Sequence, residues 1–589
     1  MTPICCFRFT AFVLFILISG GLSAQNEWET PFEKTPNTSS SYSETIDYYK
    51  RLAAAYPSVF SLEAHGDTDA GHPLHLAIFS ADGQFSPVSA RNSDKVIVFI
   101  NNAIHPGEPC GVDASMLFFR DLLQDPDQQE KLRDVIIVAI PFYNVGGGLN
   151  RGGYSRANQN GPVMHGFRGN ARNLDLNRDF IKADSRNAQT FNQVYSQWKP
   201  HIFVDNHTSN GADYQYVLTL IPTQHNKLGG PLAKLLQDDM LPYLFAKMAA
   251  TPYEMTPYVY VRNTPEDGIA GFLDLPRYSS GYAALHHALS FMPETHMFKP
   301  FEDRVKSVYH FMHSVADYAV DARNDILTAR RESEMQTATQ TSFDLNWQID
   351  RSKSDTIMFK GYSAKNKPSD VTGLERMYYD HNDPWEKPVP HFNYYRATLN
   401  VEAPEAYILP YAYGEVADRL RWNGVRMYQL TADTEVEVET YRIEDFRTQD
   451  AYEGHYLHNR VEVSRDTQTL LFHRGDYVIP VDQAANRYIV ETLEPQAPDS
   501  WFAWNFFDGI LQQKEYFSSY VFEDYAAEYL EEHPELREKL EARKAEDADF
   551  AASGRAQLDF IYRNSPYYEP THRRYPVGRL LRPTALPLR

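Results

Sequence analysis

Four short apolar segments, separated by stretches with helical spacing, constrain the fold of this 589-residue chain most strongly. They are residues 94–101 (DKVIVFIN), 134–144 (DVIIVAIPFYN), 201–205 (HIFVD) and 288–292 (ALSFM). Short runs that are apolar throughout and rich in β-branched and aromatic residues are typical of strands covered on both faces. Because such strands alternate with helical segments, we expect an α/β domain with a mixed, mostly parallel sheet flanked by helices.

The segments around these strands have the apolar spacing of amphipathic helices. We predict helices over residues 43–56, 111–123, 231–240 and 302–322, the last of which closes the domain. Pro231 suits the first position of its helix, where a missing N–H has no consequence. The α/β domain is therefore predicted to span residues 25–330.

The composition and the residue pattern of the chain change near residue 340. Tyr, Thr and Val become frequent, polar and apolar residues alternate, and turn-forming residues interrupt the pattern, so we predict a β-rich accessory domain over residues 340–520. Residues 521–589 are predicted to form a charged helical segment, broken at Pro534, and a basic C-terminal tail.

The N-terminus has the pattern of a secretory signal. Arg8 is the only charged residue among the first 26, an apolar run follows at residues 11–22, and small residues precede a cleavage position near Ala24. We therefore predict a signal peptide over residues 1–24 and an exported protein, periplasmic or extracellular. The apolar run is shorter than a membrane-spanning helix needs, and no other segment is long and apolar enough to span a membrane.

The charge balance excludes one broad class of function. The chain has 57 Lys and Arg against 78 Asp and Glu, a net charge of −21. A general nucleic-acid-binding protein needs basic surface to replace the counterions around phosphate. We therefore expect no nucleic-acid partner.

A candidate metal site follows the first and third predicted strands. His105 and Glu108 form an H-x-x-E pair on the loop after the first strand, and His207 comes directly after the third. Ligands in open α/β sheets bind where strands end at their carboxyl edge. A set of two histidines and one glutamate suits a catalytic zinc ion, whereas Ca²⁺ and Mg²⁺ prefer oxygen ligands throughout. We predict one Zn²⁺ per chain.

The segment NLDLNRDF supplies groups that could hold a substrate and support the metal site. Asn177 and Arg178 lie side by side, and an amide with a forked guanidinium can bind a carboxylate. Asp175 could accept the free N–H of a zinc-bound histidine and fix its ring.

A carboxylate at the end of the fourth predicted strand has the properties of a general base. Glu294 follows a strongly apolar run, so partial burial should raise its proton affinity into the range useful for catalysis. A zinc ion acidifies its bound water, and a neighbouring carboxylate can take the proton.

These elements, in this order, resemble the zinc carboxypeptidase family, the carboxypeptidase A-like metallocarboxypeptidases. The resemblance covers residues 45–325. It rests on the opening helix and strand pair at 48–80, HPGE at 105–108, NVGG at 144–147, LDLNRDF at 174–180, and the strand-end residues His207 and Glu294. The resemblance implies the same roles that the residue types suggest: a zinc site of His105, Glu108 and His207, a general base at Glu294, and a clamp for the substrate's C-terminal carboxylate at Asn177 and Arg178.

Two further roles come from the resemblance alone. Arg156 would stabilise the developing oxyanion, with Arg151 as the competing choice. Tyr278 would be the family's mobile tyrosine, with Tyr282 second. The sequence also departs from the family, because many members carry an arginine between the zinc-binding histidine and glutamate where this chain has Pro106-Gly107.

The leading hypothesis is therefore an exported zinc carboxypeptidase. It would hydrolyse the C-terminal bond of a peptide with a free carboxylate by Glu-assisted attack of zinc-bound water. The alternative is a zinc-dependent amidase or deacylase that acts on cell-wall peptides or acyl-amino acids. A third reading, from another class, is a binding protein with a vestigial zinc site. No feature of the sequence indicates an oligomeric state.

Overall fold

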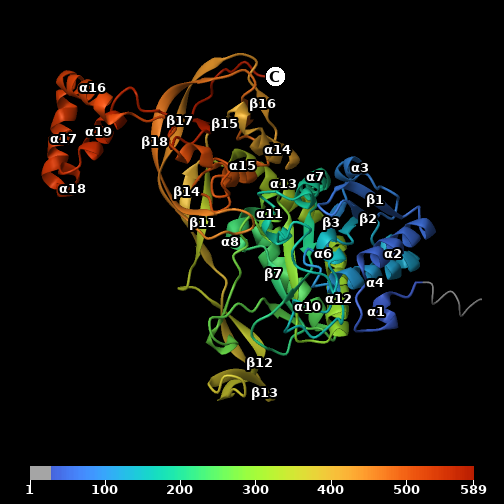
Figure 1. Cartoon of the computed structure of the whole chain (residues 1–589). Helices are drawn as coiled ribbons and strands as arrows, with labels where there is room; N and C mark the ends of the chain where they lie inside the picture. Colours follow the sequence, from blue (N-terminus) through green and yellow to red (C-terminus); the bar gives the residue numbers. More distant parts are fainter. Residues whose placement is uncertain (1–27) are drawn as a thin grey trace, which may run out of the picture. The chain divides into compact units, whose positions relative to one another are not determined.

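The computed structural model describes residues 28–589, and the predicted signal peptide lies outside them (Figure 1). The chain divides into two compact units. The first comprises residues 28–403 with 418–426 and 482–491, and the second comprises 404–417, 427–481 and 492–589. No helix within residues 28–589 has the length and apolar character that crossing a membrane requires.

The first unit is built on a nine-stranded sheet with the strand order β1-β2-β4-β3-β5-β10-β7-β8, in which β6 also pairs with β10. The strands are β1 (Phe60–Asp67), β2 (Pro73–Phe79), β3 (Val96–Asn101), β4 (Val135–Ile140), β5 (Ile202–Asp205), β6 (His207–Ser209), β7 (Leu218–Pro222), β8 (Met255–Pro257) and β10 (Leu289–His296). Strands β4, β3, β5 and β10 are parallel neighbours, and antiparallel pairs flank them. The predicted fold class is confirmed, and all four apolar runs are strands.

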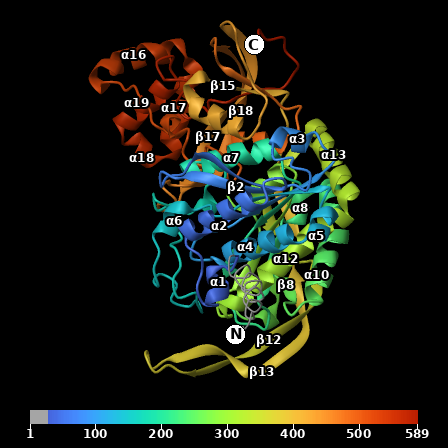
Figure 2. The ribbon, with the colours of Figure 1, turned by 90° about the vertical axis from the view of Figure 1, so that its right-hand side faces the viewer.

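Helices cover both faces of this sheet because residues along each buried strand alternate between the faces. On β3, Val96, Val98 and Ile100 belong to the core that contains α4 (Cys110–Gln124) and α12 (Phe301–Asp321). Phe99 points to the other face, where its ring contacts Phe191 and Tyr195 of α7 (Arg186–Trp198). Figure 2 shows α4 and α12 in the body of this unit.

The remaining helices of the first unit surround this core. They are α1 (Pro31–Lys34), α2 (Tyr42–Ala55), α3 (Pro87–Arg91), α5 (Pro126–Lys131), α6 (Val145–Leu149), α8 (His225–Leu228), α9 (Gly230–Leu235), α10 (Leu241–Ala249), α11 (Ser279–Leu285) and α13 (Arg323–Thr339). The helix predicted over 231–240 is α9 continued by a π-helical turn, Leu236–Met240.

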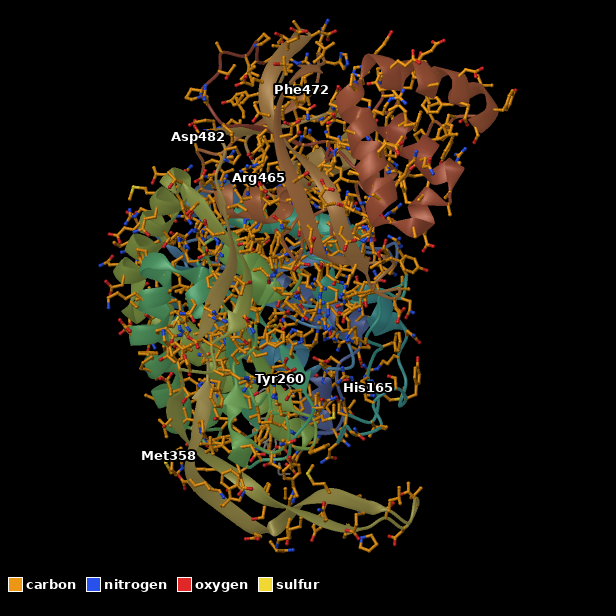
Figure 3. The ribbon with its side chains drawn as sticks, turned by 90° about the vertical axis from the view of Figure 1, so that its left-hand side faces the viewer. His165, Tyr260, Met358, Arg465, Phe472 and Asp482 are labelled. Carbon is orange, nitrogen blue, oxygen red and sulfur yellow. The ribbon has the colours of Figure 1, made fainter. Side chains whose placement is uncertain are left out.

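A long antiparallel hairpin projects from the first unit (Figures 1 and 2). It consists of β12 (Asp355–Pro368) and β13 (Glu375–Phe392), and β13 pairs in parallel with the short strand β9 (Ile269–Ala270). Phe359 packs into a small apolar core at its base, whereas the side chain of Met358, labelled in Figure 3, is exposed. The hairpin is therefore part of the first unit.

A second antiparallel pair, β11 (Ser342–Ile349) and β14 (Tyr395–Glu402), flanks the hairpin in the chain order and belongs to the same unit. The domain boundary expected near residue 340 thus falls inside the first unit, which continues to residue 403. The reason is long-range pairing: β9 precedes residue 340 and β13 follows it.

The second unit contains a six-stranded sheet with the order β16-β19-β15-β20-β17-β18. Its strands are β15 (Ala406–Leu409), β16 (Tyr428–Gln429), β17 (Thr434–Thr448), β18 (His458–Phe472), β19 (Tyr477–Pro480) and β20 (Gly578–Leu580). Between β19 and β20 in the chain order lie the helices α16 (Ser519–Glu532), α17 (Pro534–Glu546), α18 (Ala548–Ala551) and α19 (Gly554–Arg563). The predicted break at Pro534 is present, because α17 begins there.

The basic C-terminal tail includes a buried strand. Strand β20 lies between β15 and β17, and Arg579 is buried there. Its guanidinium pairs with Glu439 and Glu494. Burial of a charge requires such partners, so the two glutamates allow part of the tail to enter the sheet.

Candidate metal centre and active-site cavity

The three predicted metal ligands come from two neighbouring parts of the sheet edge. His105 and Glu108 lie on the loop between β3 and α4, and His207 begins β6. Strands β3 and β5 are parallel, so the segments that follow them meet at one edge. All three side chains are buried.

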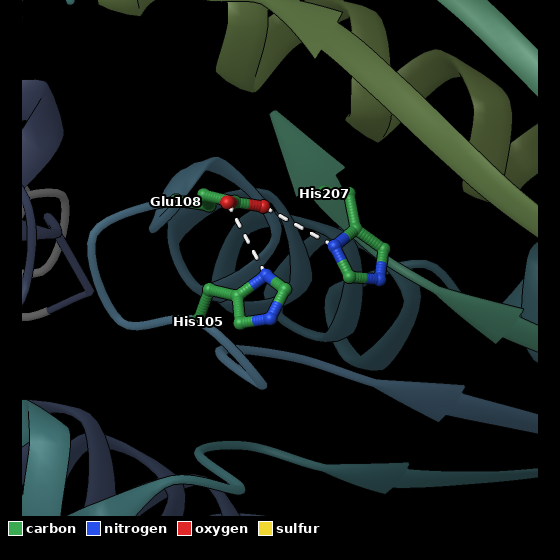
Figure 4. A group of neighbouring side chains, drawn as sticks. All are labelled: His105, Glu108 and His207. Carbon is green, nitrogen blue, oxygen red and sulfur yellow. Dashed lines mark hydrogen bonds and ion pairs between the residues drawn. The ribbon is translucent and has the colours of Figure 1, made fainter. Parts of the chain in front are cut away.

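The ligand atoms converge on one point. Glu108 Oε1 lies 3.2 Å from His105 Nδ1, and Glu108 Oε2 lies 3.2 Å from His207 Nδ1. Figure 4 shows both imidazole rings with one nitrogen facing the carboxylate. The three ligand atoms lie within 4.8 Å of one another, and no other group of three metal-ligating residues of this kind occurs in the described part of the chain.

A second carboxylate fixes each histidine from outside. Asp175 Oδ1 lies 2.9 Å from His105 Nε2, and Asp205 Oδ2 lies 2.8 Å from His207 Nε2. With Nε2 bonded outward, each ring presents Nδ1 to the centre. The sequence predicted such a role for Asp175. It missed Asp205, although an acid two residues before a ligand histidine at a strand end was the available signal.

The donor set fits a zinc ion. His105 Nδ1 is buried and faces Glu108 Oε1, and because Nε2 is bonded outward to Asp175, the neutral ring would present its Nδ1 lone pair to the centre. Two imidazole nitrogens and one carboxylate are the ligands of a catalytic zinc with an open position. The outer carboxylates also match the pattern that orients zinc-bound histidines.

The charges of this cluster are mutually dependent. Although burial opposes ionisation, His105 and Arg156 hold the pKa of Glu108 well below its ordinary value. Burial also disfavours charge on His207, but Asp205 raises the pKa of that imidazole well above the usual range. Without a cation at the centre, the protein therefore favours a proton on His207, and a metal ion would have to displace it.

Glu294 lies within β10, two residues before its end. Its Cα is paired with that of His207 in the parallel register of β10 and β6. Burial raises the pKa of Glu294 to about 7, and the neighbouring charge of His207 opposes this shift. The carboxylate therefore has a proton affinity suited to general acid–base catalysis near neutral pH.

A cavity of about 640 Å³ opens over these residues. The metal-site residues and Glu294 line one part of it. The predicted carboxylate clamp, Asn177 and Arg178, lines another part together with Tyr278. The Arg178 guanidinium lies 4.5 Å from the ring centre of Tyr278, within cation–π range. Asn177 Oδ1 accepts the backbone N–H of Ser279, so the amide nitrogen of Asn177 is directed away from that contact.

The structure distinguishes between the two arginines that the sequence proposed for the oxyanion role. Arg156 lines the cavity, and its Nη2 donates to Glu108 Oε1 at 2.5 Å. Arg151 instead donates to the backbone carbonyls of Ser39 and Ser40 and does not line the cavity.

A third arginine lines the cavity and was missed by sequence reasoning. Arg168 Nε donates to Asp175 at 3.0 Å, and its Nη1 lies 3.4 Å from Glu108. Its side chain is 44% exposed, against 12% for Arg156. No sequence signal marks Arg168, because it lies on an irregular segment between α6 and the Asn177–Arg178 pair.

The tyrosine candidates differ in the same way. Tyr278 lines the cavity at the start of α11. Tyr282 is fully buried, and its hydroxyl donates to Asn423, so it does not reach the cavity. Two aromatic residues that the sequence did not single out, Tyr258 and Phe272, complete the wall beside Tyr278.

Part of the chain that carries these residues matches a known protein family. Residues 45–217 match the model of the zinc carboxypeptidase family. The match covers less than a third of the chain. The zinc carboxypeptidase segment contains the three candidate ligands, Arg168 and the Asn177–Arg178 pair. Glu294 and Tyr278 lie beyond it, in the continuation of the same sheet.

Individual relatives of the zinc carboxypeptidase segment cover limited parts of each chain. Carboxypeptidase 2 of Trichophyton rubrum and carboxypeptidase 2 of Trichophyton equinum are each 25% identical over 166 residues, which is 28% of this chain and 28% of theirs. The chain thus spans less than a third of the length of these curated relatives.

The comparison with solved structures finds weak similarity to a metallo-carboxypeptidase from Burkholderia cenocepacia and to carboxypeptidase A from Helicoverpa armigera. The first has a TM-score of 0.37 and 16% identity, covering 48% of this chain and 70% of that one. The second has a TM-score of 0.38 and 13% identity, covering 49% and 75%.

Proposed function

We propose that this protein is a zinc-dependent carboxypeptidase that removes single residues from the C-terminus of peptides. The observation that carries the proposal is the joint lining of one cavity by the His105–Glu108–His207 site, by Glu294 and by the Asn177–Arg178 pair. A zinc ion held by the three ligands would polarise the scissile carbonyl and acidify a water molecule.

The substrate would be oriented by its free carboxylate. Arg178 supplies a forked, permanently charged donor, and Asn177 supplies an amide N–H₂ beside it. The ring of Tyr278 packs against the Arg178 guanidinium and limits its freedom. This clamp places the bond before the last residue over the metal site and favours removal of one residue per turnover.

Glu294 would take a proton from the attacking water and deliver it to the leaving amine. Its raised pKa suits both steps, because a base with a pKa near the working pH can also act as the acid. We propose Arg168 as the donor to the developing oxyanion, since its guanidinium is the more exposed of the two arginines in the cavity.

Export belongs to the same proposal. The signal-like pattern in residues 1–24 supports a periplasmic or extracellular location, and peptides are substrates available in both.

The experiment that tests the function uses purified mature protein and pairs of peptides that differ only in a free or amidated C-terminus. Mass spectrometry follows the products with and without a zinc chelator. We expect loss of single C-terminal residues from free ends only, abolished by the chelator. Cleavage of amidated peptides at the same rate would contradict the clamp and favour an amidase or deacylase.

A further inference from the structure

The backbone of Gly107, inside the H-x-x-E motif, lies directly under the guanidinium of Arg156. A methyl group on Gly107 would lie 2.3 Å from Arg156 Nε, 3.1 Å from its Cδ and 3.2 Å from its Cζ. The φ angle of Gly107 is not in the left-handed region, so backbone conformation does not demand a glycine here. A side chain on Gly107 would force the Arg156 guanidinium to leave this position.

Arg156 uses this position to hold a carboxylate. Its Nη2 donates to Glu108 Oε1 at 2.5 Å, and its Nη1 donates to Gln159 Oε1 at 3.0 Å. Gln159 Nε2 in turn donates to the carbonyl of Gly107 at 2.9 Å. Gly107, Arg156 and Gln159 therefore form a ring of contacts, and Arg156 links this ring to Glu108.

The loop that carries Arg156 is anchored at its far side. The buried Arg304 of α12 donates to the carbonyls of Asn160 and Gly161 at 2.8 and 2.5 Å. The N–H of Asn160 donates to the carbonyl of Met297 at 2.7 Å. These contacts tie the segment after Arg156 to α12 and to the residue that follows β10.

Both oxygens of Glu108 accept hydrogen bonds from the protein. Oε1 accepts from Arg156 at 2.5 Å and from Arg168 Nη1 at 3.4 Å, and Oε2 accepts from the backbone N–H of Thr208 at 2.8 Å. The two shorter contacts, with Arg156 and Thr208, orient the carboxylate between the two histidines. The side chain of Arg156 is only 12% exposed, which leaves little of it available to a substrate.

We infer that Arg156, lying on Gly107, is a positioning residue that orients Glu108 toward the metal, and that it does not contact the reacting carbonyl. The inference rests on the zinc site of the proposed function. The absence of a side chain at Gly107 leaves space for the Arg156 guanidinium, and that guanidinium holds the Glu108 carboxylate. Outer partners of this kind are commonly worth 10- to 100-fold in metal affinity.

The test measures the zinc affinity of metal-free protein by competition with a chelator, so the readout does not require turnover. We expect Gly107→Ala and Arg156→Ala each to weaken zinc binding by about 10- to 100-fold. The double variant should bind zinc only slightly more weakly than the single variant with the larger loss of affinity, because both changes remove the same contact. Gly554→Ala is the control, since a methyl group there would meet no atom within 4 Å.

Turnover at saturating zinc separates positioning from direct catalysis. Arg156→Ala loaded with zinc should recover kcat to within about threefold of the unaltered protein. A kcat that stays about 100-fold lower at full zinc occupancy would overturn the inference, because Arg156 would then contact the reacting group. This arm also decides the matter if Gly107→Ala fails to fold.

The zinc measurements distinguish this inference from the proposed function. Unaltered affinity in Gly107→Ala or Arg156→Ala, or a double-variant loss equal to the product of the single losses, would overturn the inference and leave the zinc site intact. If the unaltered protein bound no zinc, the proposed function itself would fail.

Discussion

Glu294 on β10 lies opposite His207 on β6, with the two residues paired in a parallel register. Directly paired residues of neighbouring strands project from the same face of a sheet. The pairing therefore places the proposed general base beside a proposed metal ligand by main-chain hydrogen bonding, which is more rigid than placement on a loop.

Replacing this carboxylate should separate catalysis from metal binding. We expect Glu294→Gln to reduce kcat on the order of 10³-fold, because glutamine cannot take the proton from water. Zinc content, measured by elemental analysis, should stay at the level of the unaltered protein. Glu130→Gln, which alters an exposed carboxylate paired with Arg133, is the matched control. Full turnover in Glu294→Gln would exclude this residue as the base.

The pH dependence of kcat/KM should report the same group. A base must be ionised, and a raised pKa means that Glu294 gains its proton as the pH falls through about 7. We therefore expect kcat/KM to decrease on the acidic side, about tenfold per pH unit below the pKa of this group. The positive charge of bound zinc would move the midpoint to lower pH without changing the sign. Activity that rises on acidification would contradict the assignment.

Loss of the clamp should depend on the substrate's C-terminus. We expect Arg178→Ala to lower kcat/KM for peptides with a free carboxylate on the order of 100-fold, about 3 kcal/mol, because a charge-assisted contact is lost. Any residual cleavage of amidated peptides should not change. Arg133→Ala is the control, because it removes an exposed guanidinium that does not line the cavity. An equal loss on both peptide types would place the role of Arg178 elsewhere.

The outer carboxylate on His207 should control metal affinity. Asp205→Asn keeps the size of the side chain but weakens its acceptor, so we expect zinc affinity to fall about 10- to 100-fold. Chelator competition provides the measurement, and Asp47→Asn on an exposed face of α2 serves for comparison. No change in affinity would show that the ring of His207 is oriented by other contacts.

Much of the central sheet could be predicted from the sequence. The segments at 94–101 and 201–205 are apolar throughout because helices cover both sides of the sheet, and that pattern is local. The three candidate metal ligands could also be predicted from the sequence, because they follow these strands within a few positions. Their convergence needed only the rule that parallel strands end at one edge.

The features that were missed depend on distant partners. Arg168 lies on an irregular loop without periodicity, and only its contacts with Asp175 and Glu108 reveal its place. The positioning role that we infer for Arg156 depends on the absence of a side chain at Gly107, and no single motif displays that relationship.

The unit boundary was missed for a similar reason. Strand β9 pairs with β13 across more than 100 residues, and alternation within β13 gives no hint of that pairing. Strand β20 contains a charged arginine, which reads as surface until Glu439 and Glu494 are brought beside it.

The most direct measurement of the central claim is a zinc titration of metal-free protein, with hydrolysis of a free-ended peptide as the readout. The account predicts that activity is absent at the start, rises in proportion to added zinc, and levels off at one zinc per chain, as occupancy of the His105–Glu108–His207 site requires. Full hydrolysis by protein proven to be free of metal would contradict it, and so would continued absence of hydrolysis after one zinc per chain has bound.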